Sequence, residues 1–233
     1  MNYLVIGGAT GIGKRLTEIL LEKGHKVHVA SRNAKANLEE DSNLVVNDLD
    51  AVDSDTDWSF LPEELDGVAY CAGTINLKPF KRLKPEDFKK DFDVNLIGAV
   101  NTIQAALPAL KKGNGGSILL FSSVAAQRGL TFHASVAAAK GAIEGLTRAL
   151  SAELAPDIRV NALALSLTDT PLAQNLLSTD KKKESSNDRH PLKRYGKPND
   201  AASIGAFLLS ADADWITGQV IGVDGGMGTI QNI

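Results

Sequence analysis

The sequence is poor in the residues that build disulfides and metal centres. Among 233 residues there are 1 cysteine and 4 histidines. A single cysteine, Cys71, excludes an internal disulfide and a multi-cysteine zinc site, which fits a reducing compartment. The histidines have no spacing typical of metal ligands. We therefore expect no metal centre, and we expect a cytoplasmic protein.

Long apolar segments and an excess of charge of one sign are also missing. No apolar run approaches the roughly 18 residues that cross a membrane. Because the chain reads as a strand from Tyr3 onward, we expect no signal peptide. The 25 basic and 28 acidic side chains give a net charge of −3, whereas nucleic-acid and anionic-membrane surfaces need a basic face. We expect neither as a partner.

What the sequence does contain is a regular alternation of two patterns. Short β-branched segments occur at residues 3–6, 26–30, 44–47, 67–71, 116–121, 158–163 and 219–223. Helical periodicity lies between the first two, and near 85–111, 134–155 and 198–210. This alternation predicts one doubly wound α/β (Rossmann) domain over residues 1–233, with a parallel sheet of about seven strands and helices on both faces. Ligands of such sheets bind at the carboxyl ends of the strands.

The first predicted strand is followed by a glycine-rich turn at the start of the first predicted helix. Its residues are Gly7, Gly8, Ala9, Thr10, Gly11, Ile12 and Gly13. Glycine lets a phosphate approach the backbone, and the unpaired N–H groups of a helix N-terminus favour an anion. A glycine-rich turn is often only a turn, and the spacing here is Gly-x3-Gly-x-Gly. Its place in the first βα unit favours dinucleotide binding.

The end of the second predicted strand indicates which dinucleotide binds. A carboxylate there holds the 2′-hydroxyl of NAD, whereas the 2′-phosphate of NADP needs positive charge. The sequence has Ser31 and Arg32 and no acid, so we expect NADP, with Lys14 and Arg15 adding positive potential. The alternative is that Arg32 is an ordinary surface arginine. Asp48, after the third strand, either accepts from the adenine amine or is a turn residue.

Several short motifs occur one after another along the chain. They are Gly7 to Gly13, Asp48-Leu49, Ala72-Gly73, Asn95, Ser122-Ser123, Lys140, Arg159 to Ala162, Thr217 to Gln219 and Asp224 to Gly226. In order and spacing they resemble the short-chain dehydrogenase/reductase family over almost the whole length. The resemblance implies strand order 3-2-1-4-5-6-7 and a nicotinamide cofactor. It also implies an Asn-Ser-Tyr-Lys active site, in which the tyrosine gives a proton to a carbonyl oxygen as the nicotinamide gives hydride to carbon.

The resemblance assigns roles to individual side chains. Ser123 would orient the substrate carbonyl, Asn95 would hold a water in a proton relay, and Lys140 would bind the nicotinamide ribose and lower the phenol's pKa. The tyrosine is expected four residues before Lys140, where the sequence has Val136. Valine carries no ionisable proton, so we expect an altered proton donor.

The same carry-over gives a set of cofactor-binding residues. They are Gly7, Thr10, Gly11, Ile12, Gly13, Ser31, Arg32, Asp48, Leu49, Ala72, Gly73, Asn95, Lys140 and Thr170. Gly73 can serve both as a glycine that the βα turn requires and as a glycine that lets the cofactor approach the backbone.

Two side chains near position 136 are candidates to replace the phenol. His133 carries an imidazole, which is a competent acid near neutral pH, and Ser135 carries a hydroxyl. Each has an ordinary alternative, a loop histidine and a helix cap respectively. Tyr70, on the fourth strand, and Tyr195, in a turn, are poor candidates.

Other positions depart from the family pattern as well. Tyr70-Cys71 stands where two asparagines are common, which puts the hydrogen bonding between sheet and helix in question. Leu165-Ser166 stands where a Pro-Gly pair near the nicotinamide ring is usual.

Residues 178–194 form the one clear shift in composition, to a polar and charged stretch. A solvated loop or mobile surface helix is the ordinary interpretation. Because Leu172, Leu176 and Leu177 precede it, a substrate lid over about 170–194 is the alternative. The candidate pocket rims, residues 74–80, 124–133 and 172–193, show no charge signature.

Gly141 and Gly145 interrupt an alanine-rich helix that commonly lies at a dimer interface in this family. Small residues allow close helix contact, so we expect a homodimer or homotetramer. The preferred function is an NADP(H)-dependent oxidoreductase that interconverts an alcohol and a carbonyl on a small molecule. The alternative is a cofactor-binding protein that has lost catalysis and acts as a sensor or assembly subunit.

Overall fold

A computed structural model describes residues 1–38, 41–53, 55–113 and 115–230 of the chain. The strands run parallel in one sheet in the order β3-β2-β1-β4-β5-β6-β7. Their bounds are β1 Asn2–Ile6, β2 Lys26–Ser31, β3 Leu44–Asp48, β4 Gly67–Tyr70, β5 Gly116–Ser123, β6 Ile158–Leu165 and β7 Val220–Val223. The predicted doubly wound Rossmann fold and its strand order are confirmed.

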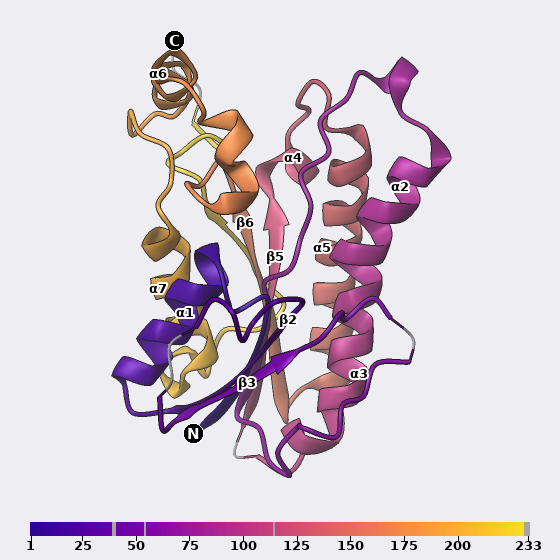
Figure 1. Ribbon diagram of the computed structural model, residues 1–233, viewed down its shortest axis with the longest axis vertical. Coiled ribbons are helices and arrows are strands. Elements are labelled where there is room, and N and C mark those ends of the chain that lie inside the picture. Colours follow the sequence, from indigo (N-terminus) through magenta and orange to yellow (C-terminus); the bar gives the residue numbers. More distant parts are fainter. Residues whose placement is uncertain (39–40, 54, 114, 231–233) are drawn as a thin grey trace.

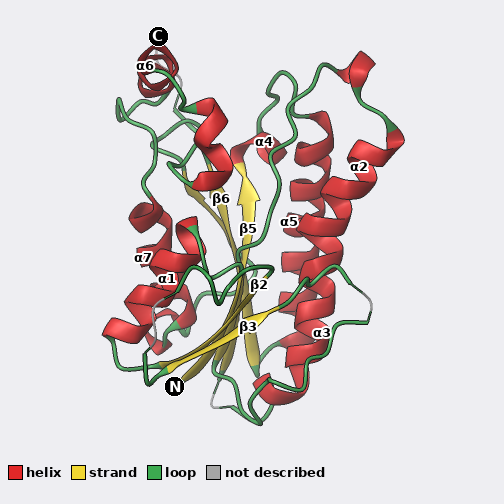
Figure 2. Ribbon diagram, in the orientation of Figure 1, coloured by secondary structure: helices red, strands yellow, loops and turns green. Residues whose placement is uncertain are grey.

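Helices cover both faces of this sheet, as Figures 1 and 2 show. The helices are α1 Gly11–Glu22, α2 Pro85–Phe92, α3 Gly98–Leu110, α4 Val124–Gln127, α5 Ala134–Leu154, α6 Asp180–Arg189 and α7 Pro198–Leu209. Short 3-10 helices occur at Phe80–Arg82, Pro171–Leu176 and Ala211–Ala213. The helical periodicity near 85–111 divides into α2 and α3, joined by a π-helical turn, η2 Asp93–Ile97. Such turns are frequent at functional sites.

Two apolar cores hold these layers together, one on each face of the sheet. On one face α1 and α7 pack with Leu16 and Leu208 against the strands. On the other face α3 and α5 do so with Ile103 and Ile143. Each of these four side chains is at most 4% exposed. A doubly covered parallel sheet leaves its carboxyl edge as the place where polar side chains can gather.

A histidine is buried inside the sheet. His28 lies in β2 between Leu4 of β1 and Val45 of β3, and it is 4% exposed. Neither ring nitrogen has a hydrogen-bond partner among the described residues. Burial, aided by Lys26, lowers the pKa of this imidazole. Protonation therefore favours the unfolded chain.

We predict an acid sensitivity of folding that originates at His28. The pKa of His28 is lower in the folded than in the unfolded chain. The stability that its neutral ring contributes is therefore complete above the unfolded pKa of about 6.5. As the pH falls below that pKa, this stability decreases by up to about 1.4 kcal/mol per pH unit. Urea unfolding of wild type and His28→Val at pH 7 and pH 5 measures this. The wild type should lose more stability than the variant between the two pH values, and equal losses would contradict the prediction.

Candidate active site

The glycine-rich turn between β1 and α1 forms an open backbone cradle. Gly7 has φ of +75°, and a Cβ placed there would lie 2.9 Å from the backbone nitrogen of Ala72. A Cβ at Gly13 would collide with the Gly7 carbonyl oxygen. Thr10 is the extended N-cap residue of α1, but its side chain caps no N–H group, and no acid lies in the first turn. The N–H groups and partial positive charge of this helix end are thus available to an anion, which fits a pyrophosphate.

An exposed arginine follows the end of β2. Arg32 directly follows β2 and is exposed, and the described chain gives it no hydrogen bond or ion pair. By contrast, Arg15 contacts Glu18 at 3.0 Å and Glu22 at 2.9 Å. Two carboxylates therefore offset the positive potential that Arg15 was expected to add.

The neighbouring predicted residues also have local partners. Lys14 Nζ donates to the carbonyl of Asn37 at 3.3 Å. Ser31 lies opposite Asp48 in the sheet and accepts the N–H of Leu49 through its carbonyl. One carboxylate oxygen of Asp48 accepts the N–H of Lys35 at 3.1 Å, which is typical of a turn residue and leaves its second oxygen for a ligand.

Lys140 of α5 is a buried cation at the carboxyl end of β5. It is 8% exposed, and its Nζ donates to the carbonyl of Phe121 at 2.8 Å. Burial lowers the pKa of this ammonium to about 8, against the opposing effects of Cys71 and Asp91. The same burial raises the pKa of the Cys71 thiol to about 12. Cys71 is therefore a neutral neighbour and not a nucleophile.

Asn95 lies beside this lysine, across a glycine. A Cβ at Gly73 would lie 3.1 Å from Asn95 Oδ1 and 3.5 Å from Lys140 Nζ. Asn95 belongs to η2, and its Nδ2 donates to Thr74 Oγ1 and to the carbonyl of Asp91, both at 2.8 Å. Thr74 Oγ1 in turn donates to Asp91 Oδ1 at 2.6 Å. The amide is thus fixed by two donated bonds, with its oxygen directed toward the space beside Gly73.

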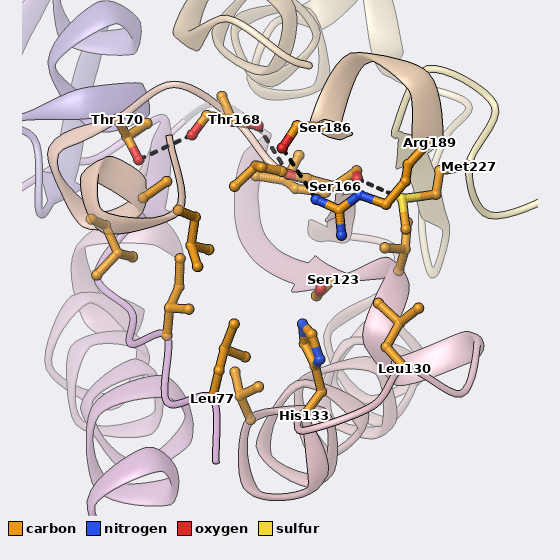
Figure 3. A pocket seen from close by; sticks show the side chains of 18 of the residues that line it. Leu77, Ser123, Leu130, His133, Ser166, Thr168, Thr170, Ser186, Arg189 and Met227 are labelled. Atoms are coloured by element: carbon orange, nitrogen blue, oxygen red, sulfur yellow. Dashed lines mark hydrogen bonds between the residues drawn. The ribbon is translucent and has the colours of Figure 1, made fainter. Parts of the chain in front are cut away.

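A cavity of about 630 Å³ opens next to this group. Its wall includes six of the predicted site residues: Ile12, Ser123, His133, Val136, Lys140 and Thr170. Ser123 ends β5, and its hydroxyl accepts the N–H of Ala125 at the start of α4. Figure 3 shows Ser123 and His133 on the same side of the cavity.

The charged side chains among the described residues that line this cavity are all basic. Alongside leucine and isoleucine side chains the lining includes Lys140, Lys181, Lys182 and Arg189 and, among the described lining residues, no carboxylate. The expectation of pocket rims without a charge signature was therefore wrong. For residues 180–189 the ordinary interpretation was a solvated loop or a surface helix. These residues form α6, and several of its side chains line the cavity.

The candidate replacements for the phenol lie in different settings. His133 is the N-cap residue of α5, its Nδ1 lies 2.7 Å from the carbonyl of Thr131, and its ring reaches the cavity wall. Ser135 is fully buried, and its hydroxyl has no partner among the described residues. The helix-cap interpretation of Ser135 was therefore wrong. Tyr195 is not among the described lining residues.

Tyr70 connects the sheet to the π-helical turn. Its hydroxyl donates to the carbonyl of Val94 at 2.6 Å, and burial raises its pKa well above the ordinary value. A Cβ at Gly98 would collide with this hydroxyl. The bonding between sheet and helix that two asparagines would supply is thus supplied here by a phenol, which is committed and unsuited to acid catalysis.

One pair of polar residues at the cavity was missed by the sequence analysis. Ser166 Oγ lies 2.7 Å from His190 Nε2, and both residues line the cavity. The only signal was Ser166 in place of a Pro-Gly pair. His190 lay hidden in the polar segment 178–194.

A helix N-terminus open to anions, a buried lysine and a serine thus lie at the carboxyl edge of a doubly wound sheet, an arrangement that fits a nicotinamide-dependent oxidoreductase. A family model described as enoyl-(acyl carrier protein) reductase matches residues 7–228. A tropinone reductase homolog of Arabidopsis thaliana is 35% identical, covering 97% of this chain and 92% of that protein. The 3-oxoacyl-(acyl-carrier-protein) reductase of Thermotoga maritima is 34% identical, covering 96% of each.

Solved structures agree with these sequence matches. A short-chain dehydrogenase family protein from Francisella tularensis has a TM-score of 0.89 and 28% identity, covering 97% of this chain and 98% of that one. ElxO with NADP bound has a TM-score of 0.88 and 27% identity, covering 97% and 98%. A 4-hydroxyisoleucine dehydrogenase complexed with NADH has a TM-score of 0.89 and 26% identity, covering 99% of each. The chain belongs to the short-chain dehydrogenase/reductase family. Among the described residues, no helix is long and apolar enough to cross a membrane.

We predict that Gly7→Ala weakens NADPH binding at least tenfold, a loss of about 1.4 kcal/mol, because the added Cβ meets Ala72 at the cradle. Gly24→Ala is the matched control, since Gly24 has φ of +76° and nothing within 4 Å of the added Cβ. Both variants should lose about 1 kcal/mol of stability from backbone strain, and Gly7→Ala should lose more because its Cβ also meets the Ala72 backbone. NADPH fluorescence titration separates them, and equal binding by the two variants would contradict the cradle assignment.

Proposed function

We propose that this protein is an NADP(H)-dependent oxidoreductase that interconverts an alcohol and a carbonyl on a small molecule, with an altered proton donor. The main observation behind this proposal is that Ser123, Val136 and Lys140 line one cavity. Asn95 lies beside Lys140, across Gly73. Three polar members of the family's site are thus gathered, and the fourth position holds an apolar side chain.

The placement of Val136 supports its assignment to the tyrosine position. Val136 and Lys140 stand four residues apart on α5, which places them on one face of the helix. Both reach the cavity, and Val136 is 6% exposed. A phenol extending from position 136 would enter the cavity that Ser123 also borders. Valine fills this position without a hydroxyl.

The remaining side chains suit substrate and cofactor binding. A bound NADPH would supply the hydride. The ammonium of Lys140 would donate to the nicotinamide ribose hydroxyls, and Ser123 Oγ would donate to the carbonyl oxygen and stabilise charge that develops there. Gly7, Thr10, Gly11, Ile12 and Gly13 would hold the pyrophosphate. The other cofactor contacts, at Ser31, Arg32, Asp48, Leu49, Ala72, Gly73 and Thr170, stay predictions.

Arg32 supports NADP as the preferred form of the cofactor. A guanidinium after β2 that has no partner among the described residues attracts a 2′-phosphate by charge as well as by hydrogen bonds, whereas it can only hydrogen-bond to a 2′-hydroxyl.

We predict that Arg32→Asp lowers affinity for NADPH by at least tenfold, about 1.4 kcal/mol, and improves NADH binding relative to NADPH. The new carboxylate repels the 2′-phosphate and accepts from a 2′-hydroxyl. Fluorescence titration with both nucleotides measures the ratio of dissociation constants. Arg15→Gln is the control, because Arg15 is already paired with Glu18 and Glu22. A preference unchanged by Arg32→Asp would place the 2′-phosphate elsewhere.

The second candidate function is an NADP-binding sensor or assembly subunit without turnover. Val136 itself favours it, since the usual proton donor is gone. Following NADPH absorbance with a panel of ketones, aldehydes and quinones distinguishes the two. Because the cavity is lined by cations, each carbonyl is best offered both as a carboxylate and as its neutral ester. NADPH binding without oxidation across the panel would favour the sensor.

We predict that Val136→Tyr raises carbonyl reduction by about 10²- to 10⁴-fold, the usual contribution of a positioned acid. A tyrosine there would lie beside Lys140, whose charge favours the phenolate. Initial rates of NADPH oxidation measure the effect, with Val136→Phe as the control that adds the ring without the hydroxyl. An equal gain in both variants would show that ring packing, and not proton donation, is responsible.

We propose two further features of the intact enzyme. Residues 170–194 act as a lid, because α6 and the 3-10 helix Pro171–Leu176 contribute to the cavity wall. The protein forms a homodimer or homotetramer through α5, where a Cβ at Gly141 or Gly145 meets nothing within 4 Å. Light scattering that gives a monomer at micromolar concentration would contradict the oligomer. The cytoplasmic location stays a prediction.

A further inference from the structure

A serine and a histidine that no step above uses meet at the cavity wall. Ser166 directly follows β6, and His190 directly follows α6. Ser166 Oγ and His190 Nε2 lie 2.7 Å apart, and His190 is 1% exposed. In Figure 3, Ser123 lies between Ser166 and His133. A buried imidazole therefore contacts a hydroxyl that borders the cavity.

The contact that His190 makes through its second ring nitrogen, Nδ1, determines which ring nitrogen carries a hydrogen in each charge state. Its Nδ1 lies 2.6 Å from the carbonyl oxygen of Ser186, and a carbonyl oxygen can only accept. Nδ1 therefore carries a hydrogen in both charge states of the ring. Nε2 is then the nitrogen that gains or loses a proton, accepting from Ser166 when the ring is neutral and donating to Ser166 when it is charged.

When the ring is charged, the hydrogen of the Ser166 hydroxyl is free to point elsewhere. The neighbour it meets is Met227 Sδ at 3.0 Å, and a thioether is a weak acceptor that a carbonyl oxygen readily replaces. Ser123 pairs with Leu165 between β5 and β6, so Ser166 is the next residue beyond that pair. Neighbouring strands lie about 4.8 Å apart. Ser123 ends β5 and Ser166 follows β6, so both residues lie at the carboxyl edge of the sheet, and both border the cavity.

We propose that Ser166 donates the proton in carbonyl reduction and that His190 supplies it through Ser166, a proposal that rests on the proposed function. As the carbonyl carbon accepts hydride from NADPH, the C=O π electrons move to oxygen. That oxygen takes the proton of Ser166 Oγ while Ser166 takes the Nε2 proton of charged His190. The products are an alcohol, the oxidised cofactor and a neutral imidazole, which water reprotonates when the cavity empties.

A relay and a plain tether between α6 and β6 make different demands on position 190. A tether needs only a hydrogen-bonding side chain, whereas a relay needs one that releases a proton. His190→Gln keeps a donor toward Ser166 and cannot ionise, so it separates the two. Ser166→Ala removes the hydroxyl, and Ser166→Thr keeps it.

The experiment uses the carbonyl that the wild-type protein reduces best. Ser166→Ala and His190→Gln should each lower kcat by about 100-fold, with KM and the NADPH dissociation constant changed by less than about twofold. The double variant should lose no more than either single one, because the two residues act as a unit. Ser166→Thr should recover most of the rate.

Thr179→Ala is the matched control for loosening of α6. It removes the side-chain cap that accepts the N–H of Lys182 and leaves Ser166 and His190 in place. A tether predicts that Thr179→Ala and Ser166→Ala raise KM alike, whereas the relay predicts that Ser166→Ala lowers kcat well below that of Thr179→Ala. A rise in KM of that kind, with kcat unchanged in all variants, would overturn the relay.

A measurement without turnover tests the same assignment. Nitrogen NMR of the His190 ring in the protein without cofactor should show Nδ1 protonated in the neutral form, and a hydrogen on Nε2 there would overturn the relay. A wild-type protein that reduces no carbonyl in the panel refutes the proposed function itself. Wild-type turnover that Ser166→Ala leaves unchanged refutes only the proton donor.

Discussion

The site depends on a buried ammonium at the carboxyl edge of the sheet. Lys140 is 8% exposed, and removing a charge from water is costly unless donors and acceptors meet it. The Phe121 carbonyl accepts one of its three hydrogens at 2.8 Å. Burial lowers the pKa of the ammonium to about 8. Its remaining hydrogens are available to the space beside Gly73, where cofactor hydroxyls would complete the solvation that the protein supplies only in part.

The π-helical turn η2 keeps that space open. It interrupts the passage from α2 to α3 and holds Asn95, whose amide donates to Thr74 and to the Asp91 carbonyl. The turn is tied to the sheet through the Tyr70 hydroxyl and the Val94 carbonyl. The absence of a side chain at Gly98 leaves room for the phenol. A turn of this kind costs helix hydrogen bonds, and these side-chain bonds offset the loss.

Local features of the fold could be predicted from the residues themselves and the strand order from the family resemblance, whereas side-chain contacts between distant residues could not. The strands were predictable because β-branched residues bounded by turns occupy each of them, and the glycine turn because its chemistry is local. The π-helical turn was not, since it depends on Tyr70, 24 residues before the Val94 that it contacts. The polar sequence of α6 fits a solvated surface helix as well as a cavity wall. The pairing of Ser166 with His190, also 24 residues apart, has no sequence signal beyond the unusual serine.

Loss of the phenol separates two requirements that the family usually meets together. Hydride transfer needs the nicotinamide and the carbonyl held in place, and Ser123, Lys140 and the glycine cradle are all present for that. Proton transfer needs an ionisable group within reach of the same oxygen. At position 136 the side chain cannot supply one, so the proposed relay draws the proton from Ser166 and His190 instead.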